Sequence, residues 1–508
     1  MPSVLGIDSG LTVTKAVIFD ADGSTLAVAR RRVAQIMTTP HHVERDMDEL
    51  WQATAEAIRE AISASGRPAS DIVAVAATAH GDGIYLLDAE RRPLGLGIVS
   101  LDSRAGDIVA EWAANGVADR SLALTGQMPH PAAPSAVLAW IKRNEPERYA
   151  RIAHMLPCKD YLRFCLSGTI GTDRTEASTS FTNVTTQDYD PDILALFDLS
   201  ELAHALPPIA HSAEIVGHVT AEAAARTGLM EGTPVAAGLH DVTASSLGVG
   251  AHVEGVIAVI AGTYSINEVL SREPRTDPRW LCRNAIEPGL WHSQAISPAS
   301  SANYEWFLET LCRSDQATAA ADGASIHDRL GAEIDAAMAR RSTALFHPFL
   351  FGSPFGPQAS AGFFGLRAWQ GRGEMLRAVL EGIAFNHRVH VDALREGFEA
   401  KTIRITGGIS RSPRFVQMFC DVLGLPVSVT ETDEAAAWGT ALCAGAGAGL
   451  FPSPSHDPRD LKRLTRTYSP DPARQAEYET RYRLFTDLAA AMAPLWPRID
   501  ALAAGDAP

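Results

Sequence analysis

Asp8, Asp82 and Asp241 each follow a run of apolar residues that predicts a buried strand, and each lies close to a glycine. A carboxylate presented at a strand end can accept a proton, hold Mg²⁺ through water, or accept hydrogen bonds from hydroxyl groups. These are the tasks that phosphoryl transfer to an alcohol sets for protein side chains. We therefore interpret Asp241 as a candidate general base, Asp8 as a candidate Mg²⁺ ligand through water, and Asp82 as a candidate clamp for sugar hydroxyls.

The segment D-S-G-L-T-V-T-K at residues 8–15 predicts a β-hairpin turn. Backbone N–H groups around Gly10, the hydroxyls of Thr12 and Thr14 and the cation of Lys15 could together cradle phosphate oxygens. An ordinary hairpin with a polar turn is the alternative, and this segment alone does not exclude it.

A second loop of the same kind, A-G-T-Y-S, stands at residues 261–265 and includes Gly262 and Thr263. Two such loops, one opening each half of the chain, favour a triphosphate held from two sides. Neither loop matches GxxxxGK[ST], so a P-loop fold is not supported. The absence of GxGxxG after the first predicted strand also argues against a dinucleotide-dependent dehydrogenase.

Two further groups of residues could bind a sugar. His80 and Asp82 stand in the loop H-G-D-G that closes a predicted strand, while Asp102 and Arg104 form an acid–base pair farther on. A plain surface loop would contain the same residue types. Asp241 likewise has an alternative role as the N-cap of a helix, which aspartate favours.

Composition narrows the class of protein. The chain has 508 residues, enough for two or three domains, and a formal net charge of −16, which disfavours a nucleic-acid partner. The 6 cysteines include no CxxC pair, so we expect free thiols in a reducing compartment. The first residues lack a secretory pattern and no apolar run is long enough to span a membrane, so we expect a cytoplasmic enzyme without membrane contacts.

The order of predicted elements indicates two halves built on one plan. A hairpin at residues 4–20 is followed by a helix at 48–65 and a buried strand at 71–79, and the sequence from about residue 250 begins with another hairpin. We therefore predict a sugar-binding domain over residues 1–250, containing the first phosphate loop. A nucleotide domain is predicted over 251–495, containing the second phosphate loop and the adenosine site.

With these loops in order, the chain resembles the FGGY family of carbohydrate kinases, in the superfamily that also contains actin and heat-shock chaperone ATPases. The stretches GIDSGLTVTKAVIFD, KDYLRFCLSG, GLHDVTASSLGVG, AGTYS and TGGISRSPRFVQMFCDVLGLPV carry the resemblance. It implies an α/β fold of two RNase-H-like domains, with mixed sheets flanked by helices and an active site in the cleft between the domains. It also implies ATP and Mg²⁺ as cofactors, a small sugar or polyol as substrate, and a homodimer.

The resemblance also implies roles for individual residues. Asp241 is similar to the general base of the family, and Asp82 stands where the family places a sugar-binding carboxylate or histidine. The residues implied to contact ATP are Asp8, Thr12, Thr14, Lys15, Gly262, Thr263, Gly407, Gly408 and Ser412. The residues implied to contact the substrate are His80, Asp82, Asp102, Arg104 and Asp241. His130 and His240 are expected only to pack or cap.

Three segments depart from the family pattern. Ile409 replaces the third glycine of the adenosine turn, and residues 352–354 read G-S-P in place of Gly-Glu-Arg. Residues 81–83 read G-D-G in place of the Met-His-Gly of D-xylulose kinases. Around residues 79–105 and 204–229 the chain is most similar to L-xylulose kinases, with erythritol kinases next, so L-xylulose or a related pentulose is expected and a polyol remains the alternative. A silent actin-like nucleotide-binding regulator is disfavoured because Asp241 is present.

Overall fold

The computed structural model describes residues 1–39, 41–432 and 434–502. The described chain forms two compact units. Unit 1 contains Met1–Glu254, Leu270–Gln294 and Glu431–Leu464, and unit 2 contains Gly255–Val269, Ala295–Thr430 and Thr465–Pro508. The predicted boundary at residue 250 lies close to the first crossing, but two later segments return to unit 1.

Unit 1 is built on a six-stranded mixed sheet in the order β12-β13-β6-β1-β2-β3. Strand β1 pairs antiparallel with β2 and parallel with β6, which in turn pairs parallel with β13. The strands span Ser3–Ser9 (β1), Val13–Asp20 (β2), Thr25–Arg32 (β3), Ile72–Ala79 (β6), Ile215–His218 (β12) and Pro234–Ala236 (β13). The carboxyl ends of β1, β6 and β13 therefore lie at one edge of the sheet. Asp8 is the last residue but one of β1, whereas Asp82 and Asp241 follow the ends of β6 and β13.

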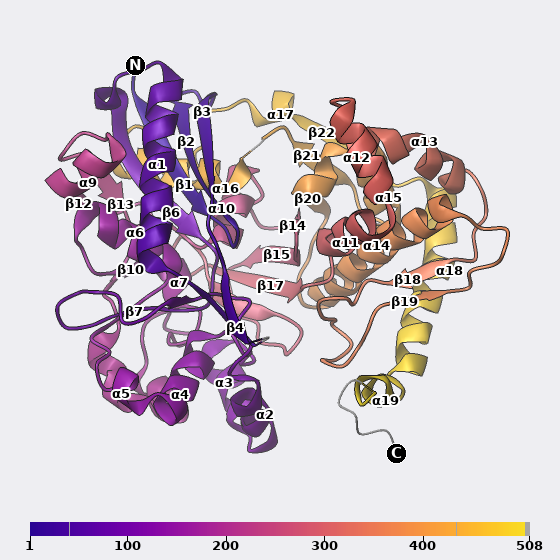
Figure 1. Cartoon of the computed structure of the whole chain (residues 1–508), viewed down its shortest axis with the longest axis horizontal. Helices are drawn as coiled ribbons and strands as arrows, with labels where there is room; N and C mark the ends of the chain where they lie inside the picture. Colours follow the sequence, from indigo (N-terminus) through magenta and orange to yellow (C-terminus); the bar gives the residue numbers. More distant parts are fainter. Residues whose placement is uncertain (40, 433, 503–508) are drawn as a thin grey trace. The chain divides into compact units, whose positions relative to one another are not determined.

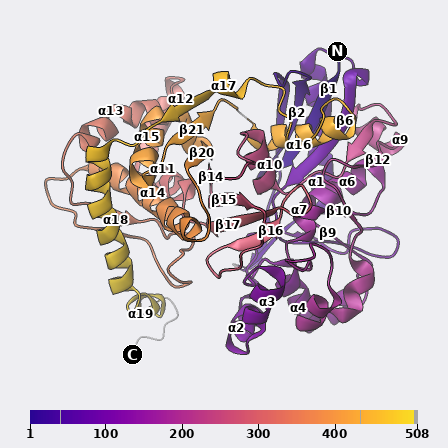
Figure 2. The same ribbon diagram turned by 180° about the vertical axis from the view of Figure 1, so that it is seen from behind.

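Helices cover both faces of this sheet (Figures 1 and 2). Helix α1 (Met47–Ser65) packs on β2 and β3, and α6 (Cys158–Ser167) packs on β6, whereas α10 (Asp241–Gly248) and α16 (Ala435–Gly447) cover the other face. Gly439 of α16 lies so close to α10 that a Cβ there would stand 2.0 Å from the Ala244 carbonyl oxygen. This close approach fixes α10, and with it Asp241, against the sheet.

Helix α1 illustrates how the sequence specifies these layers. Asp46 begins the helix by accepting a hydrogen bond from the Glu49 N–H at 2.9 Å, and Gly66 ends it in a left-handed conformation at φ 65°. Leu50, Trp51, Ala57, Ile58 and Ala61 share the buried face. Each large apolar side chain buried in this way contributes about 1.5–3 kcal/mol.

Smaller elements of unit 1 form a second hydrophobic cluster beside the main sheet. Its helices are Gly106–Ala114 (α2), Val117–Thr125 (α3), Pro134–Asn144 (α4), Pro146–Tyr149 (α5) and Pro191–Leu196 (α8). Tyr85–Leu87 (β7), Gly97–Ile98 (β8) and His154–Leu156 (β9) are its short strands. Other short strands of unit 1 are Ile36–Thr39 (β4), His42–Arg45 (β5), Thr172–Asp173 (β10), Ile209–Ala210 (β11) and Leu281–Asn284 (β16), the last of which pairs antiparallel with Trp291–Ser297 (β17). Two further helices are Arg174–Ala177 (α7) and Ala221–Thr227 (α9).

Unit 2 repeats the topology of unit 1. Strand β14 (Val256–Ala261) pairs antiparallel with β15 (Ser265–Ser271) and parallel with β20 (Thr402–Thr406), and β20 pairs parallel with β21 (Val427–Thr430). The remaining strands are Trp291–Ser297 (β17, which lies in unit 1 as far as Gln294), Leu345–His347 (β18), Gly362–Phe364 (β19) and Thr465–Tyr468 (β22). The helices are Ser301–Leu311 (α11), Arg313–Ala321 (α12), Ile326–Met338 (α13), Arg372–Gly397 (α14), Pro413–Leu423 (α15), Leu461–Leu464 (α17, in unit 1), Pro472–Met492 (α18) and Trp496–Asp500 (α19).

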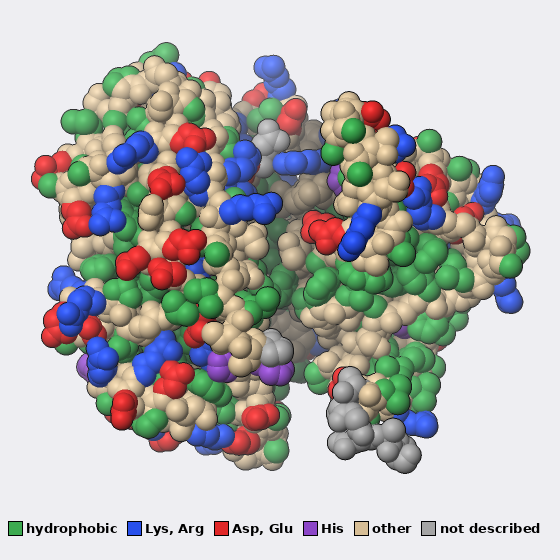
Figure 3. All heavy atoms as spheres, in the orientation of Figure 1, with side chains coloured by type: hydrophobic (Ala, Val, Ile, Leu, Met, Phe, Trp, Pro, Cys, Tyr) green, Lys and Arg blue, Asp and Glu red, His purple; other side chains and the backbone are tan. Residues whose placement is uncertain are grey.

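The surface and the cysteines complete the description. On the face drawn in Figure 3, acidic and basic side chains are interspersed over unit 1, so the net negative charge is not gathered into one patch there. All six cysteines are free thiols, as predicted. Within the described ranges, none of the helices is long and apolar enough to cross a membrane.

Candidate active site

The turn between β1 and β2 contains the residues predicted to bind phosphate, but the Gly10 N–H already donates to the Val13 carbonyl at 2.9 Å. Its carbonyl oxygens are already bound: the Gly10 carbonyl accepts from Arg45 at 3.2 Å and the Leu11 carbonyl accepts from Gln35 at 3.0 Å. Thr12 lies at the tip of the turn with its side chain exposed. The loop therefore presents a hydroxyl group to solvent, while the buried Arg45 and the half-buried Gln35 hold its backbone in place.

Lys15 and Asp8 form an ion pair at the base of this turn. The Lys15 Nζ lies 3.2 Å from Asp8 Oδ2 and 3.0 Å from Glu434 Oε2, and Glu434 also pairs with Arg30. Burial opposes the charge on Lys15, yet the two carboxylates raise the pKa of its ammonium group above the usual value. Asp8 is 16% exposed, so its carboxylate remains accessible to a hydrated cation.

The loop after β6 places Asp82 against a buried arginine. Asp82 has a left-handed backbone at φ 58°, and both of its carboxylate oxygens accept from Arg283 Nη2, at 2.9 and 3.1 Å. His130 Nε2 lies 3.6 Å from Asp82 Oδ1. Although burial opposes ionisation, Arg283 and His130 hold the pKa of Asp82 well below its usual range. Asp82 is therefore a carboxylate, with lone pairs left over for hydroxyl groups.

Asp241 is the first residue of α10, directly after the loop that follows β13. The structure gives the cap position to His240, so Asp241 is not the N-cap. Its side chain is 34% exposed, and Oδ1 accepts from the Val242 N–H at 2.8 Å. Partial burial, followed by the nearby carboxylates of Asp8 and Asp82, raises the pKa of Asp241 to about 7. Such a group can take up a proton near neutral pH.

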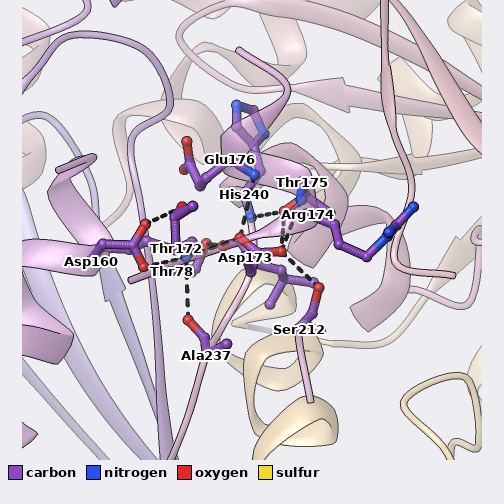
Figure 4. A network of polar contacts seen from close by, with 12 residues as sticks. Thr78, Asp160, Thr172, Asp173, Arg174, Thr175, Glu176, Ser212, Ala237 and His240 are labelled. Carbon is purple, nitrogen blue, oxygen red and sulfur yellow. Dashed lines mark hydrogen bonds and ion pairs between the residues drawn. The ribbon is translucent and has the colours of Figure 1, made fainter. Parts of the chain in front are cut away.

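Hydrogen bonds from two threonines fix the backbone on which Asp241 stands. Thr78 Oγ1 donates to the Leu239 carbonyl at 2.6 Å, and the His240 N–H donates to Thr175 Oγ1 at 2.8 Å. Thr175 in turn donates to Asp173 Oδ2 at 2.8 Å, as Figure 4 shows. Lys159, fully buried, lies 3.0 Å from Asp173 Oδ1. The backbone beside Asp241 is thus held by a buried network of hydrogen bonds and an ion pair.

Unit 2 contains the second predicted phosphate loop and the turn that the sequence predicts for adenosine. In the β14–β15 turn, Thr263 is exposed and the Gly262 carbonyl accepts from Ser301 Oγ at 2.6 Å. After β20, Gly407 has φ 102°, and a Cβ on it would stand 2.5 Å from the Ala261 carbonyl oxygen. A Cβ on Gly408 would meet no heavy atom within 4 Å, whereas Ile409 is buried. The turn therefore presents open backbone at Gly408.

Comparisons with known proteins agree with this geometry. The model of the FGGY family of carbohydrate kinases, N-terminal domain, matches residues 3–248, and that of the C-terminal domain matches residues 257–448. The chain belongs to the FGGY family of carbohydrate kinases. It is therefore a sugar phosphotransferase, and the resemblance predicted from the sequence is confirmed.

Individual relatives cover almost the whole chain. It is 34% identical over 499 residues to the L-xylulose/3-keto-L-gulonate kinase of Escherichia coli K12, covering 97% of this chain and 98% of that protein. It is 29% identical over 511 residues to the erythritol kinase of Brucella abortus, covering 98% and 97%. The crystal structure of xylulose kinase from Rhodospirillum rubrum superimposes with a TM-score of 0.85 at 29% identity, covering 97% and 99%. The predicted two-domain α/β fold is confirmed.

Some residues predicted to contact a ligand are instead buried against other protein side chains. Thr14 is fully buried, and its hydroxyl lies 3.2 Å from Thr54 Oγ1 on α1, because alternate residues of β2 face opposite sides of the sheet. The Thr14 side chain is therefore not placed to reach a phosphate. His80 is buried with its Nε2 3.2 Å from the Tyr85 hydroxyl, and burial and Arg45 lower its pKa to about 3.

Asp102 and Arg104 are likewise paired with one another in the interior of unit 1. Arg104 donates to both Asp102 oxygens, at 2.9 and 2.8 Å, and pairs with Glu44 at 2.8 Å. Asp102 also accepts from the Val43 N–H at 2.8 Å, and both side chains are buried. This pair holds β5 to the loop after β8, and the structure does not support a direct contact between it and a substrate. Ser412 is the N-cap residue of α15 and makes no side-chain cap hydrogen bond, and its contact with ATP stays a prediction.

Sequence reasoning missed Arg283. It lies on β16 between Cys282 and Asn284, in the run W-L-C-R-N-A-I. A lone cation in an apolar strand needs a buried partner, and this was the available signal. Its partner Asp82 is 201 positions earlier, so no local pattern pointed to the pair.

Proposed function

We propose that this FGGY kinase transfers the γ-phosphoryl group of ATP to a terminal hydroxyl of a small ketose, L-xylulose or a related pentulose. The observation that carries the proposal is Asp241, a partly exposed carboxylate whose pKa of about 7 suits a general base. The relatives named as L-xylulose kinases, 34% identical over most of the chain, support the choice of substrate.

In the proposed reaction, Asp241 accepts the proton of the attacking hydroxyl. The sugar oxygen forms a bond to the γ-phosphorus while the bond from that phosphorus to the β–γ bridging oxygen breaks, and ADP leaves. Asp82 accepts hydrogen bonds from sugar hydroxyls, which orients the attacking group. Asp241 must be ionised at the start of the step, so activity should rise with pH through its pKa.

We propose nucleotide contacts for the loops of each unit taken separately. Thr12 and Lys15 in unit 1, and Gly262 and Thr263 in unit 2, supply donors for phosphate oxygens, while Gly407, Gly408 and Ser412 form the turn for adenosine. Mg²⁺ bound to the triphosphate would neutralise its charge. Asp8, carboxylate and accessible, fits a water-mediated contact with that ion.

The test is a coupled ADP-release assay with MgATP over a panel of pentuloses, tetritols and glycerol. We expect the highest kcat/KM with L-xylulose or a close stereoisomer. A clear preference for erythritol would replace the pentulose by a polyol, and ADP release unaffected by every member of the panel would overturn the proposal. Size-exclusion chromatography with light scattering tests the homodimer that we also expect.

A further inference from the structure

Arg283 joins residues from three separate parts of unit 1. Its side chain is 2% exposed. Beyond its two bonds to Asp82, Nε donates to Gln127 Oε1 at 2.9 Å and Nη1 lies 3.0 Å from His240 Nε2. A buried guanidinium with carboxylate, amide and imidazole partners connects the loop after β6 to the start of α10.

The contact with Arg283 determines which nitrogen of His240 carries the proton. A guanidinium has only donors and stays protonated, so His240 Nε2 must accept through its lone pair. The neutral ring then carries its proton on Nδ1, which lies 3.3 Å from Asp241 Oδ1. Val242 N, also 3.3 Å from Nδ1, cannot donate to a protonated nitrogen, and instead donates to Asp241 Oδ1 at 2.8 Å.

We propose that Arg283 and His240 are positioning residues that connect the sugar-binding carboxylate Asp82 to the base Asp241. Arg283 fixes His240 as the Nδ1–H tautomer. His240 then donates to Asp241 Oδ1, which leaves Oδ2 for the substrate hydroxyl. This inference rests on the roles proposed above for Asp82 and Asp241.

The packing around His240 leaves its ring little freedom. A Cβ on Gly81 would stand 2.0 Å from His240 Nε2, so glycine at this position admits the ring against the loop that carries Asp82. The His240 backbone is held by Thr175, as Figure 4 shows. Because Arg283 and Gly81 confine the ring at Nε2 and Thr175 holds the backbone, a substitution at Arg283 should change the position of the His240 ring beside Asp241.

The pH dependence of turnover distinguishes a hydrogen-bonding role of His240 from a purely structural one, because loss of packing alone would not shift the pKa of Asp241. A hydrogen bond donated to the ionised form of an acid lowers its pKa, so loss of the Nδ1–H donor should raise the pKa of Asp241. The ionisable groups around Asp241 and His240 in this part of unit 1 are Asp8, Lys15, His80, Asp82, His130, Glu176 and Arg283. A substitution at His240 leaves these side chains in place, although it removes one partner of Arg283 and a contribution that lowers the pKa values of Asp82 and His80.

The kinetic test compares His240→Asn with His240→Leu. The asparagine amide can replace the donor at Nδ1, whereas leucine keeps only bulk. We expect kcat for the sugar that the wild type uses to fall about 10- to 100-fold in His240→Leu and less than about fivefold in His240→Asn, a range typical of a lost oriented hydrogen bond. The acid limb of kcat/KM should move to higher pH in His240→Leu, with KM for ATP changed by no more than about twofold.

His390→Leu is the matched control, since His390 is a buried histidine of unit 2 whose Nε2 lies 2.9 Å from Ser297 Oγ. It should leave the pH profile unchanged. Equal losses in His240→Leu and His240→Asn, or an unchanged acid limb in His240→Leu, would overturn the proposal.

A measurement on the wild-type enzyme does not depend on any variant being active or on the substrate being known. In protein labelled with ¹⁵N-histidine, the His240 signals, assigned by their loss in His240→Asn, should show a protonated Nδ1 and an unprotonated Nε2. The opposite tautomer would overturn the inference whatever the substrate. If the tautomer is as expected but no sugar is phosphorylated, the proposed function fails and the geometry of the relay stands.

Discussion

The glycine-rich loops after β6 and after β20 follow equivalent strands of the two sheets, because each strand pairs parallel with the first strand of a hairpin. In unit 1 the loop carries Asp82, bound to a buried arginine. In unit 2 the corresponding loop has Gly408 open to solvent, and Ser410 Oγ donates to the Gly407 carbonyl at 2.7 Å. One topology thus supports a charged site suited to hydroxyl groups and an uncharged backbone surface suited to a flat ring.

The hairpin turns of the two units also differ in charge, with the charged side chains in unit 1. The β1–β2 turn has Asp8, Lys15 and Glu434 at its base, whereas the β14–β15 turn has Gly262 and Thr263. Repetition of a fold therefore predicts where loops lie, and the side chains placed on them decide what each loop binds.

The largest expected effect is loss of the proposed base in unit 1. Asp241→Asn should lower kcat by about 10²- to 10⁴-fold, because a general base contributes on that order. Asparagine keeps the shape and can accept from Val242 N–H, so sugar and MgATP should still bind by calorimetry. Turnover within about tenfold of the parent would show that Asp241 is not the base.

The next largest effect tests whether the loop after β6 binds the sugar and not ATP. Asp82→Ala should raise KM for the sugar roughly 10- to 100-fold, as loss of charged hydrogen bonds does, with KM for ATP nearly unchanged. Initial rates with each substrate varied in turn measure both constants. Equal increases in the two constants would indicate a structural role for the loop.

The reciprocal change lies in unit 2. Gly408→Trp should weaken ATP binding by about tenfold or more, equivalent to at least 1.4 kcal/mol, by occupying the space proposed for the purine. The fold should survive because a Cβ at Gly408 meets no heavy atom within 4 Å. Titration calorimetry of a folded variant with unchanged ATP affinity would remove the adenosine site from this loop.

Asp241 should also make the free energy of unfolding depend on pH. Its folded-state pKa of about 7 exceeds that of an unfolded aspartate, so its contribution is full below about pH 4 and is lost as pH rises through 7. The side chain is 34% exposed, which reduces the effect to about 1–2 kcal/mol. Relative to wild type, Asp241→Asn should therefore gain about that much between pH 4 and pH 8. Urea unfolding at both pH values measures it, and a constant difference would contradict the raised pKa.

The smallest effect distinguishes two threonines of one hairpin. Thr14→Val should cost about 1 kcal/mol of stability through the lost contact with Thr54 and change KM for ATP by less than about twofold. Thr12→Val, at the exposed tip, should raise KM for ATP several-fold with little change in thermal stability. A larger rise in KM for ATP with Thr14→Val than with Thr12→Val would reverse the assignment.

The sequence by itself determined the elements that carry the site. Apolar runs ending near glycine predicted β1, β6, β13 and β20, and the order of motifs identified the family, because both signals are local or depend only on order along the chain. Asp8, Asp82 and Asp241 were found in this way, since an acid that ends a buried strand is visible without knowledge of the strand's neighbours.

Only the tertiary structure decided the partners of these residues. Arg283 reaches Asp82 across 201 positions, and the return of residues 431–464 to unit 1 brings Glu434 to Lys15 across 419 positions. The side of the sheet on which Thr14 lies, and the saturation of Asp102 by Arg104 and Val43, likewise depend on which neighbours the fold supplies. Hydrogen bonds and ion pairs act over a few ångströms, so their partners are set by packing in space, which a linear pattern does not encode.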